Sequence, residues 1–193
     1  MTAQDFWIRF QAEIDRNPEL CDLWNDTSDF TDRIMGKLQA VIAEDGVKTE
    51  REYFRIDLIS YQSHLRQDPG APGGTEPLFG SLKRYAWDLV TAVEHENDRR
   101  LWMDEVVKLA HVACDLRVVI GYLPLDERER HGAYLDRIAE TLEGVRAWRH
   151  TRDCGEFMIL IGDCKLPRGA EEHRCVYTPY LFRNGGFIRP SWA

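Results

Sequence analysis

Apolar residues recur along the chain at two spacings, which separate helices from strands. Repeats such as Phe6, Phe10 and Ile14 place apolar side chains on one face of a helix. This spacing predicts helices over residues 3–16, 28–43, 98–113 and 126–148. Alternating or continuous apolar runs predict strands over residues 53–61, 85–96, 115–124, 155–164 and 174–182.

The order of these elements predicts an α/β fold, with a mixed β-sheet flanked by helices. The strand 85–96, the helix 98–113 and the strand 115–124 together have the length that a parallel crossover needs. The strand 53–61 is expected to pair with 85–96, through a long Pro- and Gly-rich loop at residues 66–80.

With 193 residues, the chain suits a single domain. Residues 1–27 form a helical extension, residues 28–123 form a core, and residues 124–193 add a helix and further strands. The strand 174–182 is expected at an edge of the sheet, because Pro179 has no N–H to donate to a neighbouring strand.

Two carboxylates and a histidine interrupt the end of the strand 85–96, in the sequence AVEHEN. Side chains alternate along a strand, so Glu94 and Glu96 share one face. His95 points to the other face, where a packed or hydrogen-bonded histidine is expected. If the preceding strand pairs with this one, Asp57 lies beside both glutamates, and three carboxylates converge at a strand end.

Clustered carboxylates raise one another's pKa, and burial raises it further. A divalent cation removes this cost, and carboxylate oxygens suit Mg²⁺ or Mn²⁺. The sequence therefore predicts a magnesium or manganese site at Asp57, Glu94 and Glu96. Two alternatives stay open: Asp57 pairs only with Arg55, or the acidic strand end is a solvated surface in which Asp57 and Glu94 are far apart.

The segments RIDLI at 55–59, AVEHEN at 92–97 and LWMDEVVKLAHVACDLRVVIGY at 101–122 follow one another in a suggestive order. They resemble the PD-(D/E)xK nuclease superfamily, which has the restriction-endonuclease-like fold. That family has an Asp on one strand, a Glu-x-Lys at the end of the next, and then a helix and a parallel strand. The resemblance covers residues 28–123 and implies metal-dependent hydrolysis of phosphodiester bonds in nucleic acid, in DNA rather than RNA.

The lysine position of that motif is occupied here by Glu96, as in a subset of type II restriction enzymes that have Glu-x-Glu. The resemblance implies that Asp57 and Glu94 bind the metal, and that Glu96 binds metal or acts as a general base. The following helix offers Lys108, which is the candidate to position water or to stabilise charge. The family also implies a possible homodimer.

The formal net charge of −8 is unevenly distributed: residues 145–193 carry +3 and residues 1–144 carry −11. An acidic chain is a poor general binder of nucleic acid, because such binding rests on cationic groups that displace counterions. The basic residues near the proposed site, which we predict to contact nucleic acid, are Lys83, Arg84, Arg99 and Arg100. The net charge and the missing motif lysine favour an alternative function, a non-catalytic binding module on the same fold.

No stretch approaches the roughly 20 apolar residues that cross a bilayer. The N-terminus lacks the basic start and apolar block of a signal peptide, so a cytoplasmic protein without a membrane partner is expected. The five cysteines are widely spaced and include no C-x-x-C pair, which argues against a zinc site or redox motif.

Overall fold

The strands of the sheet meet in the order in which they occur along the chain. The computed structural model describes residues 1–25, 27–63, 87–98, 101–123, 128–163 and 175–193. Within these residues, seven strands form one sheet. They are β1 (Lys48–Tyr53), β2 (Ile56–Ser63), β3 (Trp87–His95), β4 (Leu116–Tyr122), β5 (Glu156–Asp163), β6 (Val176–Arg183) and β7 (Gly186–Ile188).

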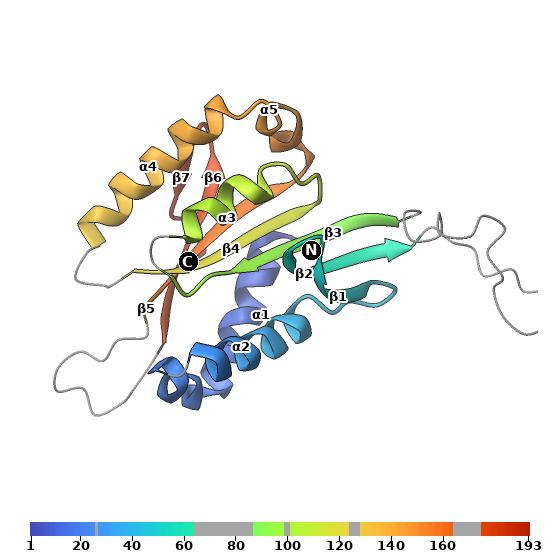
Figure 1. Ribbon diagram of the computed structural model, residues 1–193, viewed down its shortest axis with the longest axis vertical. Helices are drawn as coiled ribbons and strands as arrows, with labels where there is room; N and C mark the ends of the chain where they lie inside the picture. The colour runs from blue at the N-terminus through green and yellow to red at the C-terminus, as the bar shows by residue number, and fades with distance from the viewer. Residues whose placement is uncertain (26, 64–86, 99–100, 124–127, 164–174) are drawn as a thin grey trace, which may run out of the picture.

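The sheet has a parallel centre with antiparallel strands on each side (Figure 1). β3, β4 and β5 are parallel, whereas β1, β2 and β3 on one side and β5, β6 and β7 on the other are antiparallel. Parallel neighbours need a crossover. α3 (Trp102–Leu109) connects β3 to β4, and α4 (Arg128–Gly144), α5 (Trp148–Thr151) and η4 (Arg152–Cys154) connect β4 to β5. The predicted α/β class, the crossover and the β2–β3 pairing are confirmed.

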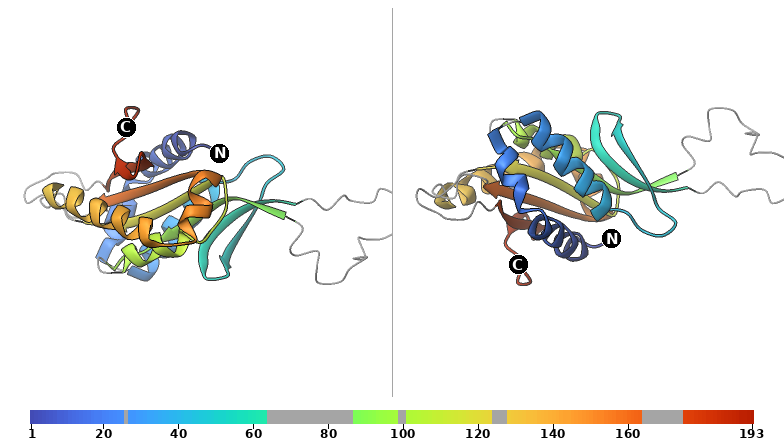
Figure 2. Two further views of the ribbon diagram at one scale, coloured as in Figure 1. Left: turned by 90° about the horizontal axis from the view of Figure 1, so that it is seen from above. Right: turned by 90° about the horizontal axis from the view of Figure 1, so that it is seen from below.

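Helices cover both faces of this sheet (Figure 2). α1 (Ala3–Arg16), η1 (Pro18–Asn25) and α2 (Thr27–Val41) lie on one face, and α3 and α4 lie on the other. One apolar core forms around Phe6, Phe10 and Leu38, and a second forms around Trp102 and Leu142. All seven residues of β4 are buried, as expected of a central strand that is covered on both faces.

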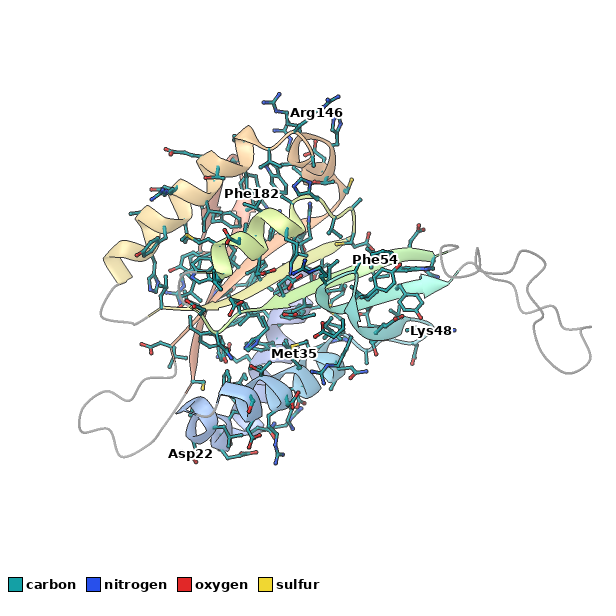
Figure 3. The ribbon with its side chains drawn as sticks, in the orientation of Figure 1. Asp22, Met35, Lys48, Phe54, Arg146 and Phe182 are labelled. Carbon is teal, nitrogen blue, oxygen red and sulfur yellow. The ribbon has the colours of Figure 1, made fainter. Side chains whose placement is uncertain are left out.

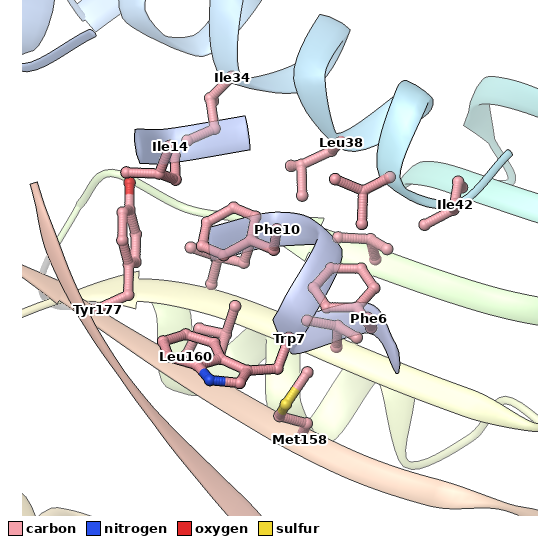
Figure 4. Packing of buried hydrophobic residues seen from close by; sticks show 14 of the residues in the cluster. Phe6, Trp7, Phe10, Ile14, Ile34, Leu38, Ile42, Met158, Leu160 and Tyr177 are labelled. Atoms are coloured by element: carbon pink, nitrogen blue, oxygen red, sulfur yellow. The ribbon is translucent and has the colours of Figure 1, made fainter. Parts of the chain in front are cut away.

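The packing of α1 follows from its sequence (Figure 4). Thr2 accepts a hydrogen bond from the N–H of Asp5, whose carboxylate accepts one from the N–H of Thr2, so a capping box starts the helix. Phe6 and Phe10 fall on one face, with ring centroids 6.0 Å apart. Phe10 then meets the ring of Tyr177 on β6 at 4.8 Å. The predicted N-terminal helix is confirmed.

The predicted strand 53–61 is wrong at its start, because the chain turns at Phe54 and Arg55. Both residues have positive φ, 47° and 65°, and they join Tyr53 to its partner Ile56. Such a turn usually carries Asn and Gly, since positive φ costs other L residues about 1–2 kcal/mol. The alternation of apolar residues continues through this turn without a break. The sequence therefore does not predict the polar strand β1 that precedes it.

β6 is not an edge strand, contrary to the expectation from Pro179. A tight turn at Asn184 and Gly185, with φ values of 53° and 85°, returns the chain as β7, which pairs with β6. β7 is short and pairs only with residues 181–183. Pro179 therefore has no pairing residue in β7, so its missing N–H leaves no hydrogen bond unmade between these two strands.

Two of the predicted helices end early. α3 ends at Leu109 and α4 at Gly144, each four residues before its predicted end, and the chain resumes a helical turn in α5. Among the helices that the structure describes, none is both long enough and apolar enough to cross a membrane.

Gly121 of β4 lets α3 lie close to the sheet, and this contact can be tested. A Cβ at position 121 would lie 2.5 Å from Cγ of the buried Trp102. We expect Gly121→Ala to lower the free energy of unfolding by about 1–3 kcal/mol, because α3 must shift. Gly36→Ala in α2 is the matched control. No atom lies within 4 Å of its new Cβ, so it should raise the stability by about 0.5–1 kcal/mol.

Denaturant unfolding of both variants measures these two changes. A Gly121→Ala protein as stable as wild type would contradict the close packing of α3 on β4.

Candidate active site

Asp57 and Glu94 are neighbours on β2 and β3. The antiparallel register pairs Leu58 with Val93, so the residue before Leu58 lies opposite the residue after Val93. The Oδ2 atom of Asp57 accepts a hydrogen bond of 2.8 Å from the backbone N–H of His95. This arrangement contradicts the alternative of an acidic surface with two distant carboxylates.

α3 brings Lys108 to the same place. Its Nζ lies 2.8 Å from Oε1 of Glu94 and donates a hydrogen bond of 2.9 Å to the carbonyl oxygen of Arg55. It also pairs with Glu105, one turn earlier in α3. Arg55 thus contributes its backbone to the site, and no ion pair between Arg55 and Asp57 occurs among the described residues. The Lys108 ammonium links the β1–β2 turn, β3 and α3.

Burial controls the charges of this site. Glu94 is 1% exposed, and burial raises its pKa to about 9; the pairing with Lys108 opposes this rise and the charge of Asp57 adds to it. Burial also raises the pKa of Asp57, against the hydrogen bond from His95. For Lys108, burial lowers the pKa, but Glu105 and Glu94 outweigh it and the net direction is upward. Burial thus favours the protonated form of Glu94, while the ammonium of Lys108 stays charged beside it.

The opposite face of β3 is a buried, hydrogen-bonded core. Nε2 of His95 lies 2.8 Å from the hydroxyl of Tyr122, which lies 3.2 Å from the hydroxyl of Tyr177. The His95 ring also lies 5.9 Å from the ring of Phe30. Burial lowers the pKa of His95 to about 3, so the ring is neutral. The prediction of a packed or hydrogen-bonded histidine is confirmed, and the ring is both.

Glu96 lies just past the end of β3. Its Oε1 accepts a hydrogen bond of 2.7 Å from the N–H of Asp98, and its own N–H donates to the carbonyl oxygen of Ile120 at 3.0 Å. The third carboxylate around Lys108 is instead Glu105, which the sequence analysis missed. The signal was its position three residues before Lys108 on the same face of α3. Glu96 stays a predicted ligand or base.

The four basic residues predicted to contact nucleic acid lie outside the described residues. They are Lys83, Arg84, Arg99 and Arg100. Their role therefore stays a prediction, as does the loop predicted at residues 66–80.

Within the described chain, no group of three or more His, Cys, Asp or Glu side chains is arranged to hold a metal ion. Mg²⁺, however, is commonly held by only one or two carboxylates, together with water and phosphate oxygens. Asp57 and Glu94 offer such a pair. Oε1 of Glu94 is buried and has its ion pair with Lys108, but no hydrogen bond of good geometry among the described residues. Carboxylate oxygens are the type of ligand that a hard divalent ion takes.

The raised pKa of Glu94 predicts how stability depends on pH. Between its ordinary value of 4.5 and about 9, the folded protein keeps a proton that the unfolded chain releases. Rising pH should therefore lower the free energy of unfolding, by at most about 1.4 kcal/mol per pH unit. Glu94→Gln cannot titrate and should flatten this slope, whereas Glu140→Gln on the exposed side of α4 should not.

Denaturant unfolding of the three proteins from pH 5 to pH 9, in the presence of a chelator, measures the slopes. Equal slopes for wild type and Glu94→Gln would contradict the raised pKa.

Comparisons with known proteins assign no family to this arrangement. No protein-family model, no curated protein and no solved structure matches the chain.

Proposed function

We propose that the protein is a metal-dependent nuclease that hydrolyses phosphodiester bonds in DNA. The observation that carries this proposal is the 2.8 Å contact between Lys108 and Glu94, beside Asp57. Two acids and a lysine thus meet from β2, β3 and α3, and a parallel strand follows in β4. This order agrees with the PD-(D/E)xK resemblance, with the lysine supplied by the helix in place of the position that Glu96 occupies.

Asp57 and Glu94 would hold Mg²⁺ or Mn²⁺, and Glu96 stays a further candidate as ligand or general base. An ion bound there would polarise a phosphoryl oxygen and lower the pKa of a bound water. Glu94 must lose its proton to become a ligand, so metal affinity should increase as the pH rises.

Lys108 contributes a fixed positive charge. Its raised pKa keeps the ammonium protonated, so it can donate to a phosphate oxygen or to the attacking water. Glu105 and the carbonyl oxygen of Arg55 hold the side chain from two directions. The charge is therefore positioned before any substrate binds, which is the condition for effective electrostatic stabilisation of a transition state.

The second candidate function is a non-catalytic binding module with a degenerate acidic site. The net charge of −8 and the glutamate at the motif lysine position favour it. A cytoplasmic location, a homodimer and DNA contacts through Lys83, Arg84, Arg99 and Arg100 belong to the nuclease proposal as further predictions.

The first test is whether the folded protein binds Mn²⁺ at Glu94. A ligand that binds only the folded state raises the unfolding midpoint, by about 5–10 °C for a chain of this size at a metal concentration of 100 times Kd. We expect this rise for wild type and for the control Asp153→Ala. Asp153 lies on η4, and 86% of its side chain is exposed. The rise should disappear in Glu94→Ala. No shift in wild type at millimolar Mn²⁺ would oppose the metal site.

The second test separates the nuclease from the binding module. We expect wild type to cleave DNA in Mn²⁺ or Mg²⁺, and Lys108→Met to cleave about 100-fold or more slowly, because it loses a preorganised charge. Lys108→Met should keep the Mn²⁺-dependent rise in midpoint, since both metal ligands remain. Metal binding without any cleavage by wild type would support the binding module.

A further inference from the structure

The turn between β1 and β2 departs from the usual chemistry of a hairpin. Glu52, Phe54 and Arg55 all have positive φ, at 57°, 47° and 65°. Backbone strain of this kind clusters at ligand-binding and active sites, where the surrounding structure maintains it. Here the surroundings include the candidate active site itself, because Lys108 donates to the carbonyl oxygen of Arg55 at 2.9 Å.

The strained turn presents an aromatic ring to solvent. Phe54 is 70% exposed, the largest value among the exposed apolar side chains of the described residues (Figure 3). β1 and β2 twist away from the rest of the sheet (Figure 2). A single exposed apolar residue is ordinary. An aromatic residue held in a strained turn beside the half-buried Asp57 and the buried Glu94 calls for a different explanation.

Phe54 is the first ring of an aromatic row along the outer strands. The row consists of Phe54, Tyr53, Trp87 and Tyr61. Its successive ring centroids are 4.6 Å, 4.9 Å and 4.6 Å apart. The last three rings are half-buried and pack against the core beneath α3. They therefore form a fixed base that supports Phe54 on the side of the sheet that carries Asp57 and Glu94.

We propose that Phe54 is a stacking platform for an unpaired base, and that the substrate of the adjacent site is single-stranded nucleic acid. This inference rests on the proposed nuclease function. Aromatic rings bind single strands through base stacking, which tolerates any sequence because every base has a π-face. The bases of a duplex are already stacked on one another, so an isolated ring at a turn favours a single strand.

The charges around the aromatic row also favour stacking as the main source of affinity. Among the described residues, two exposed cations flank the row: Arg55 at the turn and Lys48, which lies opposite Tyr61. Glu50 and Glu52 on β1 and Asp88 on β3 are exposed on the strands that carry the row, in a chain with a net charge of −8. These two cations offer about two phosphate contacts, which would contribute about 1.4 to the slope of log Kd against log salt.

The experiment uses a short single-stranded oligonucleotide that contains 2-aminopurine, whose fluorescence is quenched on stacking. Titrations are done in a chelator and in Mg²⁺. We expect wild type to quench the probe, and Phe54→Ala and Phe54→Leu to bind it about 5- to 150-fold more weakly. Phe54→Trp should bind as well as wild type. Ile188→Ala, which removes a 52% exposed side chain from the opposite edge of the sheet, is the matched control and should bind unchanged.

Phe54 is exposed, so its variants should fold, and their unfolding midpoints confirm it. Equal binding by wild type, Phe54→Ala and Phe54→Leu would overturn the proposal. So would tighter binding of a matched duplex, equal binding of an abasic oligonucleotide, or no quench in either buffer.

Cleavage of the same oligonucleotide is followed in parallel. Cleavage with a quench that does not depend on Phe54 would overturn the stacking platform and leave the nuclease standing. A quench that depends on Phe54, without cleavage, would support the stacking platform and overturn the nuclease.

Discussion

The burial of Glu94 is the constraint on which the arrangement of the site depends. A carboxylate that is 1% exposed must take up a proton or be paired with a cation. Glu94 keeps its proton up to a pKa of about 9, and it contacts the Lys108 ammonium, whose side chain reaches β3 because α3 lies close to the sheet. Gly121 permits this approach, because it has no side chain beneath Trp102. The contact of Lys108 with Glu94 and the packing of Trp102 on Gly121 thus require the same distance between α3 and the sheet.

Much of the site follows from the sequence because it depends on the two-residue period of strands. That period places Asp57 and Glu94 on one face and His95 on the other, and the crossover after β3 points Lys108 back toward them. The period fails where the backbone departs from it. Glu96 lies beyond the last strand residue, so its side chain is free to bond to Asp98 instead.

The other differences have the same origin. Phe54 continues the apolar alternation of β2, and a phenylalanine side chain gives no indication of a positive φ. Pro179 correctly indicates a missing donor, but it gives no information about a three-residue strand that pairs further along β6. Glu105 was missed because such a pair on a helix surface usually faces solvent, whereas here Lys108 also contacts the buried Glu94.

The hydrogen-bonded core behind the site has a mechanical consequence. His95 belongs to two environments: its backbone N–H holds Asp57, and its ring is tied to Tyr122 and, through it, to Tyr177. The ring of Tyr177 in turn packs against the ring of Phe10 from α1 in a T-shaped arrangement. α1 precedes all the strands in the sequence, yet it supports the residues behind the site. Its docking is connected by an unbroken succession of contacts to the donor that orients one of the two site acids.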